Sequence, residues 1–177
     1  MRRLTLARFA RPVRGVAASA LVGLVLLGCG SDRSAWQQTL AEPRVQGMVG
    51  LWAVELRLDR PGSDPMPQRA AGMISLTLNE EGNSAPGFGG PPMLFGTYDI
   101  AFRTFAPLGY EPLPNEGIPA VVGRVRGDSV DLRLAPGGKV TITMTGVLGT
   151  DSIAGRWATE YRRAGNEGTG QFVLRRR

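Results

Sequence analysis

Polar and apolar residues alternate with a period of two through most of the chain beyond position 48. In the first such run the apolar positions are Trp52, Val54, Leu56 and Leu58. The residues between them are charged or small, which is the pattern of a β-strand with one buried and one solvated face. Seven further runs repeat the alternation, around Ile74–Leu78, Tyr98–Phe102, Val121–Val125, Val130–Leu134, Val140–Met144, Ile153–Trp157 and Phe172–Leu174. The sequence therefore predicts eight short strands.

The connections between these runs are mostly tight turns, such as Gly127-Asp128 and Pro136-Gly137-Gly138. No amphipathic helix is long enough for a crossover between parallel strands, so we predict an all-β, antiparallel meander. Closing eight strands into an up-and-down barrel removes both sheet edges and leaves an interior for packed side chains or one small ligand. A β-sandwich is the alternative.

Two connections are longer than a hairpin needs. Residues 80–92 are rich in glycine and proline, and we interpret them as a flexible flap. Residues 106–119 carry four large apolar side chains: Leu108, Tyr110, Leu113 and Ile118. Such residues are expected to cap the core, to fold over a barrel mouth or to meet a partner.

The first 28 residues have the composition of an export signal. Five of the 21 basic residues precede position 29 and none of the 15 acidic residues does, so the remainder carries 16 basic and 15 acidic side chains. This near balance gives no reason to expect a nucleic acid partner. The apolar run from Val16 to Leu27 has 12 residues, fewer than the roughly 20 of a membrane-spanning helix, and we interpret it as part of a cleaved signal.

Leu26-Leu27-Gly28-Cys29, at the end of that run, resembles the bacterial lipobox. The resemblance implies cleavage after Gly28 and acylation of Cys29, with lipid of the membrane as the first partner. We therefore divide the chain into a signal peptide (1–28), a lipidated tether (29–47) and a β-barrel domain (48–177). Gly30 follows the cysteine, which implies a cell-envelope protein anchored in the outer membrane and facing the periplasm.

Gly50-Leu51-Trp52 opens the first strand of the predicted meander, which ends in arginines, and this combination resembles the calycin barrels, the lipocalins and avidins. The resemblance implies that Trp52 closes one barrel end and that Arg175 or Arg176 packs across its ring, a contact worth about 0.5 to 2 kcal/mol. Phe95-Gly96-Thr97-Tyr98 is similar to an avidin strand. Ala53 departs from the polar residue with which avidins contact biotin, so biotin binding is not expected.

The residue inventory argues against catalysis. The chain has no histidine, and its one cysteine is the predicted lipid acceptor, so Ser-His and Cys-His pairs are excluded and the commonest zinc ligands are missing. The neighbouring acids Asp128 and Asp131 are three apart on a strand and are expected to face opposite ways. We predict a protein that is not an enzyme, with no catalytic residue, metal or cofactor.

The leading functional hypothesis is a non-enzymatic envelope lipoprotein whose barrel holds a small apolar ligand. The residues expected to wall the ligand cavity are Trp52, Tyr98, Phe102 and Trp157. The inward positions are mostly large side chains, however, and these are numerous enough to fill an eight-stranded barrel. The alternative is therefore a structural or interaction module that docks an envelope protein through its loops.

Overall fold

A computed structural model of the chain describes residues 28–59, 68–105, 111–161 and 168–177. The chain divides into two compact units, residues 1–35 and 36–177, and the barrel belongs to the second. The strands are β1 (Gly50–Leu58), β2 (Arg69–Leu78), β3 (Leu94–Ile100), β4 (Val121–Arg126), β5 (Ser129–Leu134), β6 (Val140–Leu148), β7 (Ser152–Tyr161) and β8 (Thr169–Arg176). The predicted signal peptide, with Leu26 and Leu27, falls outside the described residues except for Gly28.

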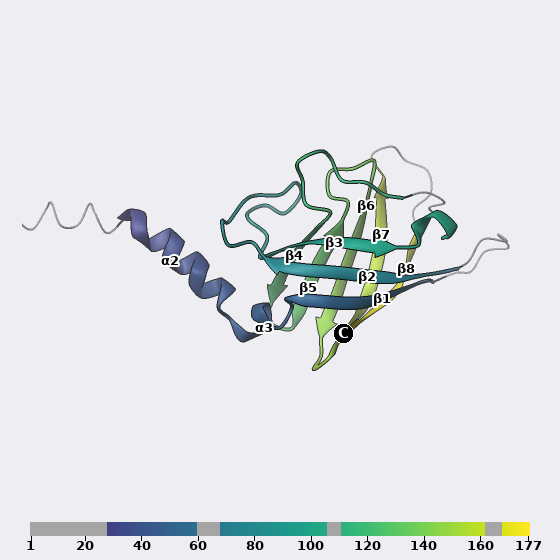
Figure 1. The fold of residues 1–177 in the computed structure, drawn as a ribbon, viewed down its shortest axis with the longest axis horizontal. Coiled ribbons are helices and arrows are strands. Elements are labelled where there is room, and N and C mark those ends of the chain that lie inside the picture. The colour runs from purple at the N-terminus through teal and green to yellow at the C-terminus, as the bar shows by residue number, and fades with distance from the viewer. Residues whose placement is uncertain (1–27, 60–67, 106–110, 162–167) are drawn as a thin grey trace, which may run out of the picture. The chain divides into compact units, whose positions relative to one another are not determined.

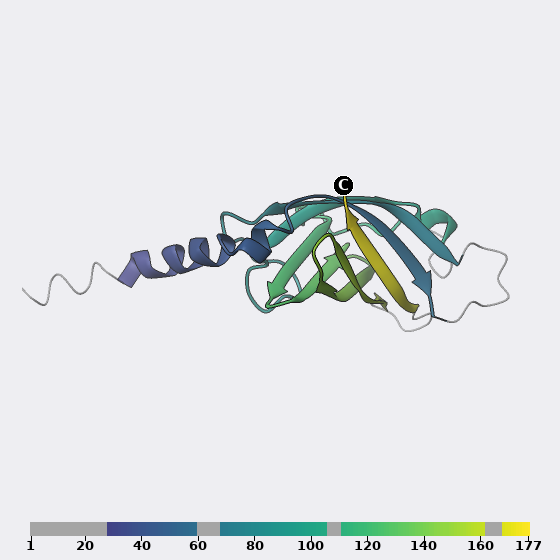
Figure 2. The ribbon, with the colours of Figure 1, turned by 90° about the horizontal axis from the view of Figure 1, so that it is seen from below.

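The eight strands form one closed antiparallel barrel in which every strand pairs with its neighbours in sequence. Figure 1 shows β1, β2 and β3 crossing in front of β5 and β6, and Figure 2 shows β8 beside β1. The closing ladder pairs Trp52 with Arg176 and Leu58 with Gly170. The predicted up-and-down barrel is confirmed, and the sandwich is excluded because β8 returns to pair with β1.

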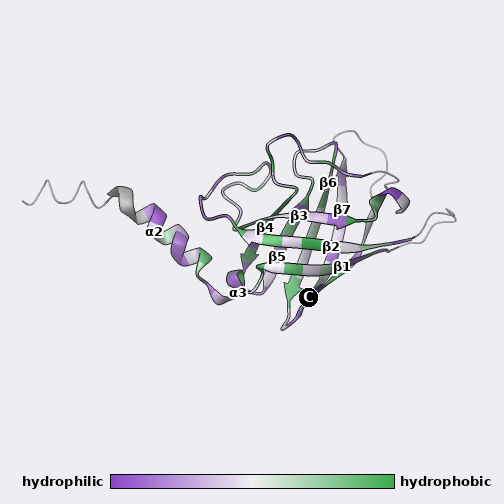
Figure 3. Cartoon of the chain, viewed as in Figure 1, coloured by the Kyte–Doolittle hydropathy of each residue, from purple (hydrophilic) through white to green (hydrophobic). Residues whose placement is uncertain are grey.

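The alternation in the sequence matches the two faces of the barrel wall. Figure 3 shows it as green bands separated by paler ones along β1 and β2. In β5, Val130, Leu132 and Leu134 are buried, while the residues between them are partly exposed. Each of the eight strands contributes buried residues to one hydrophobic core.

The junction between β3 and β4 is the shortest ladder in the barrel. It holds three residue pairs, from Leu94–Gly123 to Gly96–Val121, whereas the other junctions hold six to nine. Beyond Ile100 the chain bends at Ala101, with φ −71° and ψ 58°, into the 3-10 helix η1 (Phe102–Thr104). The prediction that Phe102 continues the third strand was therefore wrong, although the side chain still reaches the core.

In the described residues, two helices precede the first strand. Helix α2 (Gly28–Leu40) is followed by α3 (Pro43–Gln46), so most of the predicted tether (29–47) is helical. Leu40, Val45 and Met48 are buried in the barrel core, so the second half of the predicted tether packs against the barrel. In the described part of the chain, no helix combines the length and apolar character needed to cross a membrane.

Candidate functional site: the barrel interior and its two ends

The barrel end at which β1 begins is closed by Trp52. Its indole Nε1 donates a hydrogen bond to the carbonyl of Met48 at 2.9 Å, and the ring is 1% exposed. The guanidinium of Arg176 lies 5.9 Å from the ring centroid and donates to the carbonyls of Gly47 (2.9 Å) and Val49 (3.2 Å). The predicted contact between Trp52 and a late arginine is present, and the arginine is Arg176.

Gly50 explains why a glycine stands two residues before this tryptophan. Its φ is +127°, a backbone conformation that side chains with a Cβ rarely adopt. The chain needs this bend to leave α3 and enter β1. The G-x-W motif is thus a turn followed by the side chain that covers the barrel end.

Aromatic side chains gather at the opposite end. Trp157 on β7 donates from Nε1 to the carbonyl of Arg57 at 3.1 Å, and its ring centroid lies 5.6 Å from that of Phe105. Phe102, the first residue of η1, and Phe105, which follows η1, are both fully buried. The bend after β3 therefore turns two phenylalanines into the core.

Tyr98 joins this aromatic group from β3. Its ring meets Phe102 edge to face at 5.7 Å between centroids, and its hydroxyl donates to the carbonyl of Pro112. Burial raises the pKa of the Tyr98 phenol above its ordinary value, and the carboxylate of Glu111 adds to the shift. The pKa of Glu111 is raised as well, mainly by burial; Arg103 opposes this shift and Asp99 reinforces it.

The segment 111–120 crosses from Tyr98 towards the turn between β5 and β6. At Gly138 an added Cβ would stand 2.2 Å from the carbonyl oxygen of Leu113, so the two backbones touch. The Leu113 side chain is nevertheless 68% exposed. Leu108 and Tyr110, which we expected in the same loop, lie outside the described residues.

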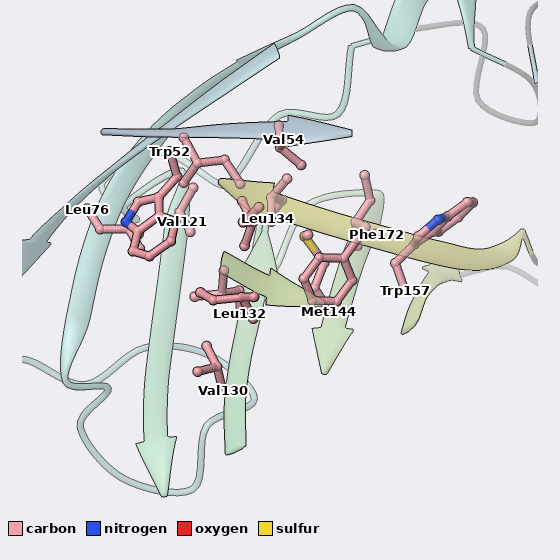
Figure 4. Close-up of a cluster of buried hydrophobic side chains, with 14 of the residues drawn as sticks. Trp52, Val54, Leu76, Val121, Val130, Leu132, Leu134, Met144, Trp157 and Phe172 are labelled. Atoms are coloured by element: carbon pink, nitrogen blue, oxygen red, sulfur yellow. The ribbon is translucent and has the colours of Figure 1, made fainter. Parts of the chain in front are cut away.

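The space next to inward-facing glycines shows how tightly the barrel interior is packed. A Cβ at Gly146 would stand 2.7 Å from Cζ of Phe172, and one at Gly123 would stand 2.6 Å from Cδ2 of Leu132. Both distances are shorter than real Cβ contacts, so side chains already fill the space in front of these glycines. Figure 4 shows the cluster that fills it, from Trp52 and Leu76 through Leu132 and Met144 to Phe172 and Trp157.

The four residues expected to wall a cavity all contribute to the core, but the structure divides them between the two ends. Tyr98 and Phe102 touch each other and lie at the end where Trp157 stands. Trp52 lies at the other end. That these four residues line a ligand cavity stays a prediction.

Sequence reasoning missed two structural residues. Phe105 stands three residues after Phe102, where the two-residue alternation of the third run has ended, so the pattern did not predict that it is buried. Asn79 is 2% exposed; its Nδ2 donates to the carbonyls of Asn83 and Pro92, both at 2.8 Å, and its Oδ1 accepts from the Asn83 amide at 3.1 Å. These bonds hold both ends of the loop between β2 and β3, and a polar residue at a strand end gave no signal of that role.

The predicted lipidation site lies at the first described residues. Gly28 and Cys29 begin α2, and only their backbone is described. Comparison with known proteins finds no protein-family model that matches the chain. No curated protein sequence matches it either.

Proposed function

We propose that this chain is a lipid-anchored, non-enzymatic protein of the bacterial cell envelope, held in the outer membrane through Cys29 and facing the periplasm. Its barrel is a scaffold that works through its surface and docks an envelope protein with the loop 111–120. The observation that carries this choice is the filled interior. Side-chain atoms of Phe172 and Leu132 occupy the space that a ligand would need next to Gly146 and Gly123.

An eight-stranded barrel can hold one small ligand, so the apolar-ligand hypothesis is the natural competitor. The aromatic side chains at both ends support that hypothesis only if space remains between them. Trp52, Phe102 and Phe105 are each at most 1% exposed. The cation–π contact between Trp52 and Arg176 supports a likeness to calycin barrels, but it closes one end rather than opening the interior.

The docking loop is supported by its contacts and by its exposed side chain. The hydroxyl of Tyr98 holds the carbonyl of Pro112, and Leu113 packs its backbone against Gly138. The loop is thus fixed on both sides of an apolar side chain that is 68% exposed. An exposed apolar side chain on a fixed backbone offers area that a protein partner can bury in the apolar core of an interface.

The anchor is tested by mass spectrometry of the full chain expressed in a bacterium with an outer membrane. We expect the purified protein to begin at Cys29 and to carry the added mass of acyl chains. Cys29→Ser should remain unacylated, and Ser31→Ala, two residues away, should be processed like the parent. An unmodified Cys29 in the membrane-purified protein would refute the lipid anchor.

The filled interior is tested by native mass spectrometry of the same purified protein, before and after extraction with organic solvent. We expect one mass, the acylated chain, that does not change on extraction or on addition of fatty acids. A discrete additional mass that solvent removes would overturn the scaffold proposal and establish a ligand-holding barrel.

Docking is tested with a photo-crosslinking amino acid placed at position 113 in cells. We expect a discrete crosslinked protein at this position. The matched control is position 147, because Val147 is 63% exposed and lies at the opposite end of the barrel. Equal crosslinking at both positions, or none at position 113, would argue against a docking loop.

A further inference from the structure

The loop between β2 and β3, residues 79–93, folds back against the outside of the barrel. Asn79 fixes its two ends, and Arg124 on β4 donates to the carbonyls of Gly90 (3.5 Å) and Pro91 (3.3 Å). Phe88 at the loop's tip is 9% exposed. The predicted flap is therefore tied to the outer wall along its length.

Two guanidinium groups hold the tip of this loop. Arg124 lies 5.2 Å and Arg133, on β5, lies 5.3 Å from the centroid of the Phe88 ring. Both arginines occupy outward positions of the wall, since their neighbours Val125 and Leu134 are buried. The contact with Phe88 restrains both long cationic side chains, and Arg124 is held in addition by its hydrogen bonds to Gly90 and Pro91.

A cavity of about 370 Å³ opens beside this contact, between the loop and the outer faces of β4, β5 and β6. Its cationic lining residues are Arg124, Arg126 and Arg133. A second cavity of about 250 Å³ shares Gly87, Arg133 and Glu160 with the first and extends towards Pro136. We call the two together the outer-wall groove; the first is within the size range of small-molecule sites.

The charges of the groove are not paired with one another. In the described residues, no guanidinium of these three arginines lies within 4.0 Å of a carboxylate oxygen. Asp131 and Glu160 also line the groove, and Asp131 accepts a hydrogen bond from the Thr145 hydroxyl at 3.0 Å. The groove thus offers a cluster of guanidinium donors and, beside it, two carboxylate acceptors.

We propose that the outer-wall groove binds a small acidic sugar, one that carries a carboxylate or a phosphate together with free hydroxyl groups. The arginines match the acid group, because guanidinium donors form strong charge-assisted hydrogen bonds to carboxylate and phosphate oxygens. Asp131 and Glu160 accept from sugar hydroxyls. The first cavity of the groove lies on the outer wall, separate from the barrel interior. The second reaches Gly137 and Gly138, which the loop 111–120 contacts, but the proposal requires neither the docking function nor a filled interior.

The test is isothermal titration calorimetry of the full protein, purified from membranes in detergent, with glucuronate, glucose 6-phosphate, glucose and inorganic phosphate. We expect saturable binding of the two acidic sugars, at least about tenfold tighter than glucose, since a charge-assisted hydrogen bond is roughly twice as strong as a neutral one. Undetectable binding of both acidic sugars, or equal binding of glucose, would overturn the proposal. Inorganic phosphate that binds as tightly as glucose 6-phosphate would overturn the sugar part.

Variants locate the binding. Arg133→Gln and Arg126→Gln should each weaken the acidic sugars about tenfold, the size expected for one lost charge-assisted contact. Arg126 is exposed, and none of the contacts described for the 79–93 loop involves it, so its replacement should leave the fold intact. The control is Arg175→Gln, an exposed arginine of β8 outside the groove, which should bind as the parent does. Equal weakening in Arg175→Gln would show a nonspecific charge effect and refute the groove.

Discussion

Arg176 spans the joint at which the barrel closes: its backbone pairs with that of Trp52 across the β1–β8 ladder, and its guanidinium lies 5.9 Å from the same residue's ring. The guanidinium also donates to Gly47 and Val49, which lead into β1. One side chain therefore joins the last strand, the first strand and the segment before it.

Arg176→Gln should lower the free energy of unfolding by about 1 to 2 kcal/mol, because it removes the cation–π contact and two hydrogen bonds. The measurement is urea denaturation followed by tryptophan fluorescence. Arg175→Gln, one residue earlier and on the other face of β8, should change stability by less than about 0.5 kcal/mol. Equal losses in both variants would mean that only the charge near the chain end matters.

Gly146→Ala should destabilise the barrel by about 1 to 3 kcal/mol, since the new methyl would stand 2.7 Å from Phe172 and 2.8 Å from the carbonyl of Ala154. Gly149→Ala is the matched control, because its nearest neighbour, the Ser152 carbonyl oxygen, is 3.3 Å away. Thermal unfolding of the two variants measures the difference. A neutral Gly146→Ala would reveal unfilled space inside the barrel.

Tyr98 should make stability fall at high pH. Its folded-state pKa is raised above the ordinary value near 10 by burial, so the unfolded chain loses the phenolic proton first. The stabilising contribution is complete below about pH 10 and declines as the pH rises towards the folded-state pKa. Absorbance titration at 295 nm should show a late ionisation step that Tyr98→Phe removes; a late step that persists in Tyr98→Phe would refute the assignment.

Asn79→Ala should cost about 1 to 3 kcal/mol, because it leaves buried carbonyls of the 79–93 loop without a donor. Hydrogen exchange at the Asn83 amide, which donates to Asn79, should accelerate. The control is Asn83→Ala, because the Asn83 side chain donates to the exposed carboxylate of Glu81 and not to the buried carbonyls that Asn79 holds. An unchanged exchange rate in Asn79→Ala would show that the loop is held by other contacts.

The strand pattern was predictable because alternation is a local property: Trp52, Val54 and Leu56 face the core simply because they are two residues apart. Closure of the barrel was also predicted, because it removes both sheet edges, but the alternation alone suits a sandwich equally well. What decides it is the pairing of β1 with β8, between residues such as Leu56 and Phe172 that no short-range signal connects. Phe102 was misplaced for a related reason, because the bend at Ala101 keeps its side chain buried without a strand.

For the candidate sites, the sequence indicated which way side chains point but not which segments come together in the fold. Arg124 and Arg126 flank the apolar position Val125, so the alternation places both on the outward face, and residues 80–92 were interpreted as a flap. The contact between Arg124 and the 79–93 loop depends on Asn79, whose hydrogen bonds hold both ends of the loop against the barrel wall. Long-range hydrogen bonds such as those of Asn79 leave no periodic pattern in the sequence, so the groove could be found only in the structure.

The ladder between β1 and β8 also sets the order of events during biosynthesis. Arg176 and Gly47 meet across 129 positions of sequence, so β1 has no partner on one side until β8 has been made and delivered. In the export route that we propose, the chain crosses the membrane before that ladder forms, and the free edges of β1 and β7 are then open to pairing with other chains. This interval is where we expect a periplasmic chaperone to protect the protein.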